Sequence, residues 1–149
     1  AASDVYKRQI HSSFERTGTE LKAVEARLRE VQPLIKNISN YQRLKPVYEA
    51  YQRAKDQAAF RSSHEAELVI FEAARSTLLA IQGEEKLPSL KSLRAEQERL
   101  LQEQQRLYEE RASLKKQSKQ IDTIKTNVDI YLSRAASQDH EIYRSSELE

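Results

Sequence analysis

The sequence contains no cysteine, methionine or tryptophan, and only 2 glycines and 3 prolines among 149 residues. Without cysteine there is no disulfide, no thiolate nucleophile and no zinc site with cysteine ligands. So few glycines exclude a Gly-rich phosphate loop or a Gly-x-Ser-x-Gly nucleophile elbow. No apolar run approaches the roughly 20 residues that cross a bilayer, and no signal-peptide pattern is present. We therefore expect a cytoplasmic protein without a membrane partner.

Charged residues make up 32% of the chain and hydrophobic residues 38%, with a net charge of only +2. Glu, Lys, Arg, Gln, Leu and Ala dominate, and these residues lose little rotamer freedom on entering a helix. The composition predicts one all-α domain of extended helices, with too little apolar material for a thick core. Such a chain has little room for an enclosed active site. We expect no catalytic residue, cofactor, metal or small-molecule substrate.

The beginning of the chain has unusual features. It starts at Ala1 and has no methionine, which indicates a fragment, a processed product or a truncated gene prediction. The segment from Ser3 to Gln9 resembles a translated sequencing adapter. We treat residues 1–9 as a non-native leader and leave them out of the functional interpretation.

Apolar residues at alternating steps of four and three predict a first long helix over residues 10–54, with kinks or short breaks near Pro33 and Pro46. A second, shorter helix is predicted over residues 58–82, ending at Gly83 as its C′ residue. Its predicted apolar face is broad and rich in small residues: Ala66, Val69, Ile70, Ala73, Ala74, Thr77 and Leu78, with Leu68, Phe71 and Leu79 on its flanks.

A third helix is predicted over residues 89–132, with Ser89 as its N-cap. Its apolar residues recur at every seventh position: Leu93, Leu100, Leu107, Leu114, Ile121 and Val128. The positions four residues further on are polar: Gln97, Gln104, Arg111 and Ser118. Polar groups there disfavour a simple two-stranded homodimer and favour packing on the chain's own helices. Residues 133–149 are predicted to form a flexible tail.

Long helices joined by short connections predict an antiparallel, coiled-coil-like hairpin or an open three-helix arrangement. Several segments, in their order and spacing, also resemble one family. They are Tyr41–Tyr51 (YQRLKPVYEAY), His64–Glu67 followed by Ala73–Ala74, Lys86–Leu93 (KLPSLKSL) and Thr123–Asp129 (TIKTNVD). From about Leu21 to Leu132 the chain resembles the helical region that follows the nuclease domain in relaxases, the mobilization nucleases of conjugative and mobilizable elements in Gram-positive bacteria.

The resemblance implies a parent enzyme that nicks one DNA strand with a tyrosine nucleophile and pilots it between cells. That family's N-terminal Tyr and metal-binding His-hydrophobe-His motif are missing here, since His11, His64 and His140 are far apart in sequence. Pro46 also departs from the family pattern. The resemblance therefore implies a non-catalytic accessory region, which positions DNA or transfer-machinery proteins.

Two groups of basic residues are candidates for DNA binding, because cations neutralise phosphates and aromatic rings stack on unpaired bases. Tyr41, Tyr48 and Tyr51 lie among the first group. The candidates are Lys36, Arg43, Lys45 and Arg53 in the first helix with Lys55 just after it, and Arg111, Lys115, Lys116, Lys119 and Lys125 in the third helix. The alternative, which the periodicity favours, is that the tyrosines pack inward and the charges are solvated.

A rival function also remains open. The heptads alone could make this chain a purely structural coiled-coil module that self-associates or spaces other domains.

Overall fold

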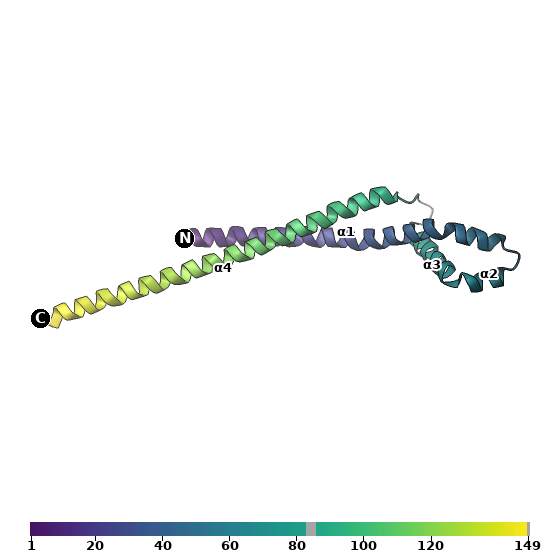
Figure 1. Cartoon of the computed structure of the whole chain (residues 1–149). Coiled ribbons are helices and arrows are strands. Elements are labelled where there is room, and N and C mark those ends of the chain that lie inside the picture. Colours follow the sequence, from purple (N-terminus) through teal and green to yellow (C-terminus); the bar gives the residue numbers. More distant parts are fainter. Residues whose placement is uncertain (83–85, 149) are drawn as a thin grey trace. The chain divides into compact units, whose positions relative to one another are not determined.

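The computed structural model describes residues 1–82 and 86–148, and within them it contains four helices and no strand (Figure 1). The helices are α1 (Ala2–Arg53), α2 (Gln57–Ser63), α3 (Glu65–Gln82) and α4 (Leu90–Leu148). The predicted all-α class is thus confirmed. Gly83, the predicted C′ residue, lies outside the described residues. Among the helices of the described part, none is long and apolar enough to cross a membrane.

Helix α1 continues without a break through Pro33 and Pro46. Each proline lacks the N–H that would bond to the carbonyl four residues earlier, on Arg29 and Gln42. Both prolines and both of these residues are exposed, so water can bond to the freed carbonyls. The structure therefore contains no interruption of the helix where the sequence predicts breaks.

The segment predicted as one helix over residues 58–82 is divided at His64 into α2 and α3. His64 leaves the helical conformation, with φ −125° and ψ 25°, and its ring stacks on Phe60 at 4.1 Å between centroids. Asp56 caps α2 by accepting a hydrogen bond from the Ala59 N–H at 3.0 Å. Arg61 of α2 donates to Glu72 of α3 at 2.5 and 2.8 Å. These local contacts hold α2 as a short helix separate from α3.

Helix α4 continues to Leu148, sixteen residues beyond the predicted end at Leu132, so the predicted flexible tail is wrong for residues 133–148. The segment has no Gly or Pro to end the helix, and two adjacent alanines, Ala135 and Ala136, favour its continuation. At the other end, Ser89 lies just before the helix, and its hydroxyl accepts from the Ser92 N–H at 3.1 Å. This is the capping bond expected there.

The contacts divide the chain into two compact units, of which the first contains Ala1–Lys22 and the part of α4 from Gln105 onward. In this unit Lys7 pairs with Asp122, and Arg16 donates to Glu110 at 2.7 Å. Because a later residue of α1 meets an earlier residue of α4, the two segments run antiparallel. Thr17 and Leu107 are fully buried between them.

The second unit, Ala23–Gln104, has the larger apolar core. Residues from α1, α3 and α4 meet in one cluster, formed by Val31, Leu34, Ile38, Leu78 and Leu93. Beside it, Phe71 of α3 is 2% exposed and stacks on Tyr41 and Tyr48 of α1, with ring centroids 5.1 and 4.6 Å apart. Arg27 of α1 pairs with Glu96 of α4 at 2.5 Å. The unit is a three-helix cluster extended by α2.

Helix α3 buries one edge of the predicted face, Ala74 and Leu78, together with the predicted flank residues Leu68 and Phe71. Its buried residues are Leu68, Phe71, Ala74 and Leu78, whereas Val69 and Ile70 remain 52% and 41% exposed. The prediction counted apolar positions, many of them alanine. The ring of Phe71 packs between Tyr41 and Tyr48 of α1, so the flank that carries it is turned inward.

Candidate nucleic-acid interface

Three of the predicted basic residues share one face of α4. At about 100° per residue, Lys115, Lys119 and Lys116 fall within an arc of about 100°. All three are exposed, as is Lys125, which is turned about 80° to the other side of Lys115. The α4 lysines therefore form a surface, which we call the lysine face (Lys115, Lys116 and Lys119).

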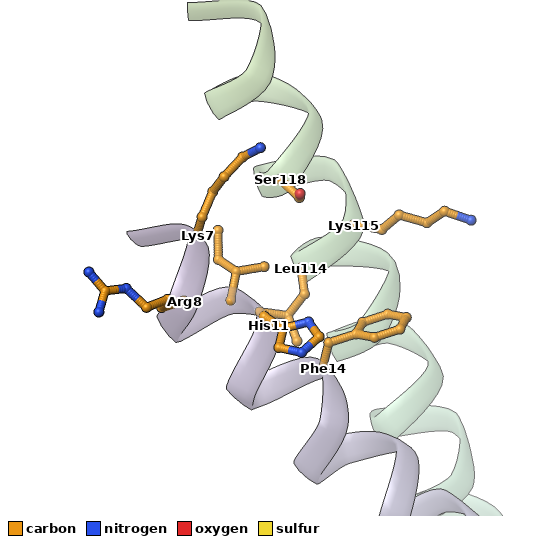
Figure 2. Close-up of a pocket in the computed structure, with 8 residues that line it drawn as sticks. Lys7, Arg8, His11, Phe14, Leu114, Lys115 and Ser118 are labelled. Carbon is orange, nitrogen blue, oxygen red and sulfur yellow. The ribbon is translucent and has the colours of Figure 1, made fainter. Parts of the chain in front are cut away.

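Beside the lysine face, the first unit has a hollow of about 460 Å³ between its α1 and α4 segments. Ile10, Phe14 and Leu114 supply its apolar lining, and the other lining residues are Lys7, Arg8, His11, Lys115 and Ser118. Figure 2 shows Arg8 and Lys115 extending away from opposite sides of the hollow, one from each helix. No acidic side chain is among these lining residues. The arrangement is an apolar floor with a basic rim.

Two of the rim residues have acidic partners nearby. Lys7 pairs with Asp122, and His11 lies 3.0 Å from Glu15, a pair that is ionic only when the imidazole is protonated. Arg8 and Lys115 have no ion-pair partner in the part of the chain that the structure describes. They are the rim cations most able to neutralise an added phosphate.

The acidic half of α4 is paired differently, with arginines of α1. Hydrogen bonds from the Arg16 guanidinium to Glu110 and Glu20 raise the pKa of Arg16 above its ordinary value. In the second unit, the hydrogen bond from Arg27 lowers the pKa of Glu96, and the same contact raises the pKa of Arg27. These arginines are engaged with α4 carboxylates, whereas in the described part of the chain the three lysines of the lysine face form no ion pair.

Arg111, a predicted DNA-binding residue, has a different set of contacts. Its Nη1 donates to the Phe14 carbonyl at 2.6 Å and to Thr17 Oγ1 at 3.2 Å. The guanidinium also lies 3.7 Å from the centre of the Phe14 ring, as in a cation–π contact. Gly18 leaves the room for it, since a Cβ there would be 2.8 Å from Nη1. Arg111 thus joins α4 to α1, and we do not include it in the interface.

The basic residues of α1 do not form one surface. Lys45 follows Lys36 by nine residues, which is about half a turn away around the helix. Arg43 donates to Asn40 at 3.3 Å, and the Lys45 ammonium lies 5.9 Å from the Tyr41 ring. These residues, with Arg53 and Lys55, are exposed and belong to the second unit, apart from the α4 lysines.

The tyrosines among those α1 residues are half-buried in a chain of aromatic contacts. Tyr41 and Tyr48 stack on Phe71, and Tyr51 lies 6.2 Å from the Phe60 ring. Arg75 donates to the Tyr48 hydroxyl at 3.1 Å. Ring faces engaged by Phe71 are closed to nucleic-acid bases, so the inward-packing interpretation describes this cluster better than a base-stacking surface.

The α1 side of the hollow is not apparent from the sequence. Lys7 and Arg8 belong to the nine residues set aside as a leader, and His11 has no neighbouring motif. The local density of cations in Lys7–Arg8 was the available signal, but only the antiparallel packing brings it to Lys115, more than a hundred residues later. Among the described residues, no group of three potential ligands converges on a metal site.

No family model matches this chain, and the comparisons found neither a similar curated protein nor a similar solved structure.

Proposed function

We propose that this chain is a non-catalytic helical accessory region of a DNA relaxase, acting in conjugative transfer or plasmid mobilization. Its role would be to position DNA, or the proteins of the transfer machinery, beside a nuclease domain. The relaxase part of this proposal is supported by the ordered resemblance over Leu21–Leu132. The DNA part is carried by one observation, the lysine face, whose three side chains are exposed on one side of α4.

The chemistry of that surface suits a nucleic-acid strand. Lys115, Lys116 and Lys119 offer three exposed cations along about one turn of helix. The His11 ring, on a side chain 74% exposed, could stack on an unpaired base. Without base-edge readout, the contact would be sequence-independent, with a dissociation constant on the order of 10⁻⁴ to 10⁻⁶ M at physiological salt.

The test is binding of labelled single- and double-stranded oligonucleotides, followed by fluorescence anisotropy at several salt concentrations. The variant Lys115→Gln/Lys119→Gln should weaken binding at every sequence. It should also reduce the slope of log K against log salt by about 1.4 to 1.8, because two phosphate contacts are lost. The matched control, Lys22→Gln/Lys91→Gln, removes the same charge from exposed sites away from the lysine face and should leave the slope unchanged.

Two results would contradict the proposal. If the chain shows no salt-sensitive binding to either kind of DNA at low ionic strength, its DNA part fails. Equal losses in the two double variants would show that net charge alone, not the lysine face, is responsible. The relaxase part is tested separately by the genomic reading frame upstream of Ile10, which should encode a Tyr near its start and a His-hydrophobe-His motif.

A further inference from the structure

The C-terminal half of α4 carries a stripe of exposed apolar side chains. Ile124, Val128, Tyr131 and Ile142 are 62%, 49%, 72% and 68% exposed, and Ala135 lies between them. Their spacing alternates between four and three residues, with Gln138 at the position between Ala135 and Ile142. A stripe of this period is the seam of a coiled coil, and an isolated helix leaves it in water.

This stripe continues an interface that already exists in the first unit. Ile121, one step earlier, is half-buried, and Asp122 beside it pairs with Lys7 of α1. A hollow of about 680 Å³ lies between the first turns of α1 and the α4 residues from Gln117 to Asp129. Further along α4, the seam residues Tyr131 and Ile142 are exposed.

The charges beside the stripe indicate which helix would cover it. Arg134 and Asp139 flank the stripe on opposite sides, because five residues turn the helix by about 140°. Neither has a hydrogen-bond or ion-pair partner among the described residues. In a parallel two-stranded coiled coil, a residue that directly precedes the seam, as Arg134 does, lies beside the residue five positions later on the other helix. Arg134 of each copy would then face Asp139 of the other.

We propose that the α4 segment 121–146 binds the same segment of a second copy as a parallel two-stranded coiled coil. The fully overlapping antiparallel alternative would place Arg134 against Arg134, which is repulsive. The paired length is on the order of 38 Å, or between three and four heptads. Tyr131 and Gln138 fit such a seam less well than leucine, so the dimer should dissociate in the micromolar range. This goes beyond the proposed DNA function, which needs only one copy.

Sedimentation equilibrium of the full chain over a concentration series tests the association. The wild-type chain should pass from the mass of one copy to that of two. Tyr131→Glu puts a carboxylate into the seam of each copy and should weaken the dimer by about 100-fold or more. Its matched control is Tyr143→Glu, since Tyr143 is similarly exposed, at 64%, but turned about 100° from Ile142. This control should dimerise like the wild type.

A second experiment tests the orientation, using the absence of native cysteine. Gln138→Cys places one thiol per copy in the seam, and under mild oxidation it should form a covalent dimer. His140→Cys, on the outer face of the same turn, should not. In the antiparallel arrangement Gln138 would lie opposite Val128, too far from its own copy to cross-link.

The association and orientation results have separate consequences. A chain that stays monomeric to about 100 µM, or equal dimerisation of the Tyr131→Glu and Tyr143→Glu variants, overturns the proposal. A dimer in which Gln138→Cys does not cross-link overturns its parallel arrangement. Neither result depends on DNA binding, since Lys115 and Lys119 are unchanged in all these variants.

Discussion

The contact between Gly18 of α1 and Arg111 of α4 allows a quantitative test of the helix pairing in the first unit. Glycine inside a helix costs about 1 kcal/mol relative to alanine. An alanine Cβ at residue 18 would, however, lie 2.8 Å from Arg111 Nη1 and 3.5 Å from Cζ. The guanidinium would have to move, and in doing so it would lose its bonds to the Phe14 carbonyl and Thr17.

The two effects of Gly18→Ala can be separated by a double-mutant cycle with Arg111→Ala. The half-buried hydrogen bonds of Arg111 and its contact with the Phe14 ring should together contribute about 1 to 2 kcal/mol. In the wild-type background, Gly18→Ala should therefore leave stability unchanged or lower it by up to about 1 kcal/mol. With Arg111→Ala the obstacle is gone, and the same substitution should stabilise the protein by about 1 kcal/mol.

The measurement is urea unfolding of all four proteins, followed by circular dichroism at 222 nm, with the m-values compared. The expected coupling free energy is about 1 to 2 kcal/mol. Ala23→Gly, at an exposed site of α1, should cost the same in both Arg111 backgrounds. If Gly18→Ala stabilises both backgrounds equally, within about 0.5 kcal/mol, then Arg111 does not occupy the space beside Gly18 in an energetically significant way.

Other substitutions test the second unit and the start of α4. Phe71→Ala should lower the unfolding free energy by about 3 to 5 kcal/mol, because the ring is buried between tyrosines, whereas Ile70→Ala, at a 41% exposed site, should cost less than about 1 kcal/mol by urea denaturation. Ser89→Ala should cost about 1 kcal/mol in the same assay through loss of the cap, and Ser89→Asp should restore it. Arg27 lowers the pKa of Glu96, so the pair stabilises the fold above the ordinary value of 4.5 and its contribution is lost as pH falls through the lowered folded value. Glu96→Gln should remove that part of the acid dependence of thermal unfolding, by less than about 1 kcal/mol because the pair is exposed; an unchanged acid dependence would contradict the assignment.

The long helices and their buried stripes could be predicted from periodicity alone. Leu28, Val31 and Ile38 of α1 are buried, as are Leu93 and Leu107 of α4, at positions where the heptad pattern places them. The polar residues in the α4 stripe also led to the expectation of an intrachain partner, and α1 contacts Arg111 in the first unit. A stripe specifies which face is buried, because side chains 3.6 residues apart share that face.

The buried face of α3, the end of α4 and the α1 side of the hollow could not be predicted from hydrophobic periodicity alone. The α3 prediction was right for Ala74 and Leu78 but placed the centre of the buried face too far toward Val69 and Ile70, because several small residues looked like a broad face. The end of α4 was wrong because loss of leucine was interpreted as loss of helix, although Ala135 and Ala136 favour helix without burial. The α1 side of the basic hollow could not be predicted, because it requires the register of α1 against α4. The two segments are distant in sequence, and no local pattern determines how they align.

Arg111 determines the register of the α1 and α4 segments in the first unit. It is also one of the polar residues that disfavour a homodimer through this part of the seam. Arg111 packs where α1 has Gly18, and it bonds to a carbonyl one turn away. A slip of α1 by one heptad would bring His11 or Glu25 to that position, each with a side chain where even a Cβ is too close. Leucines seven residues apart would tolerate such a slip, because they are interchangeable. Arg111 thus selects one alignment of α1 and α4, at the cost of some apolar burial at its own position in the stripe.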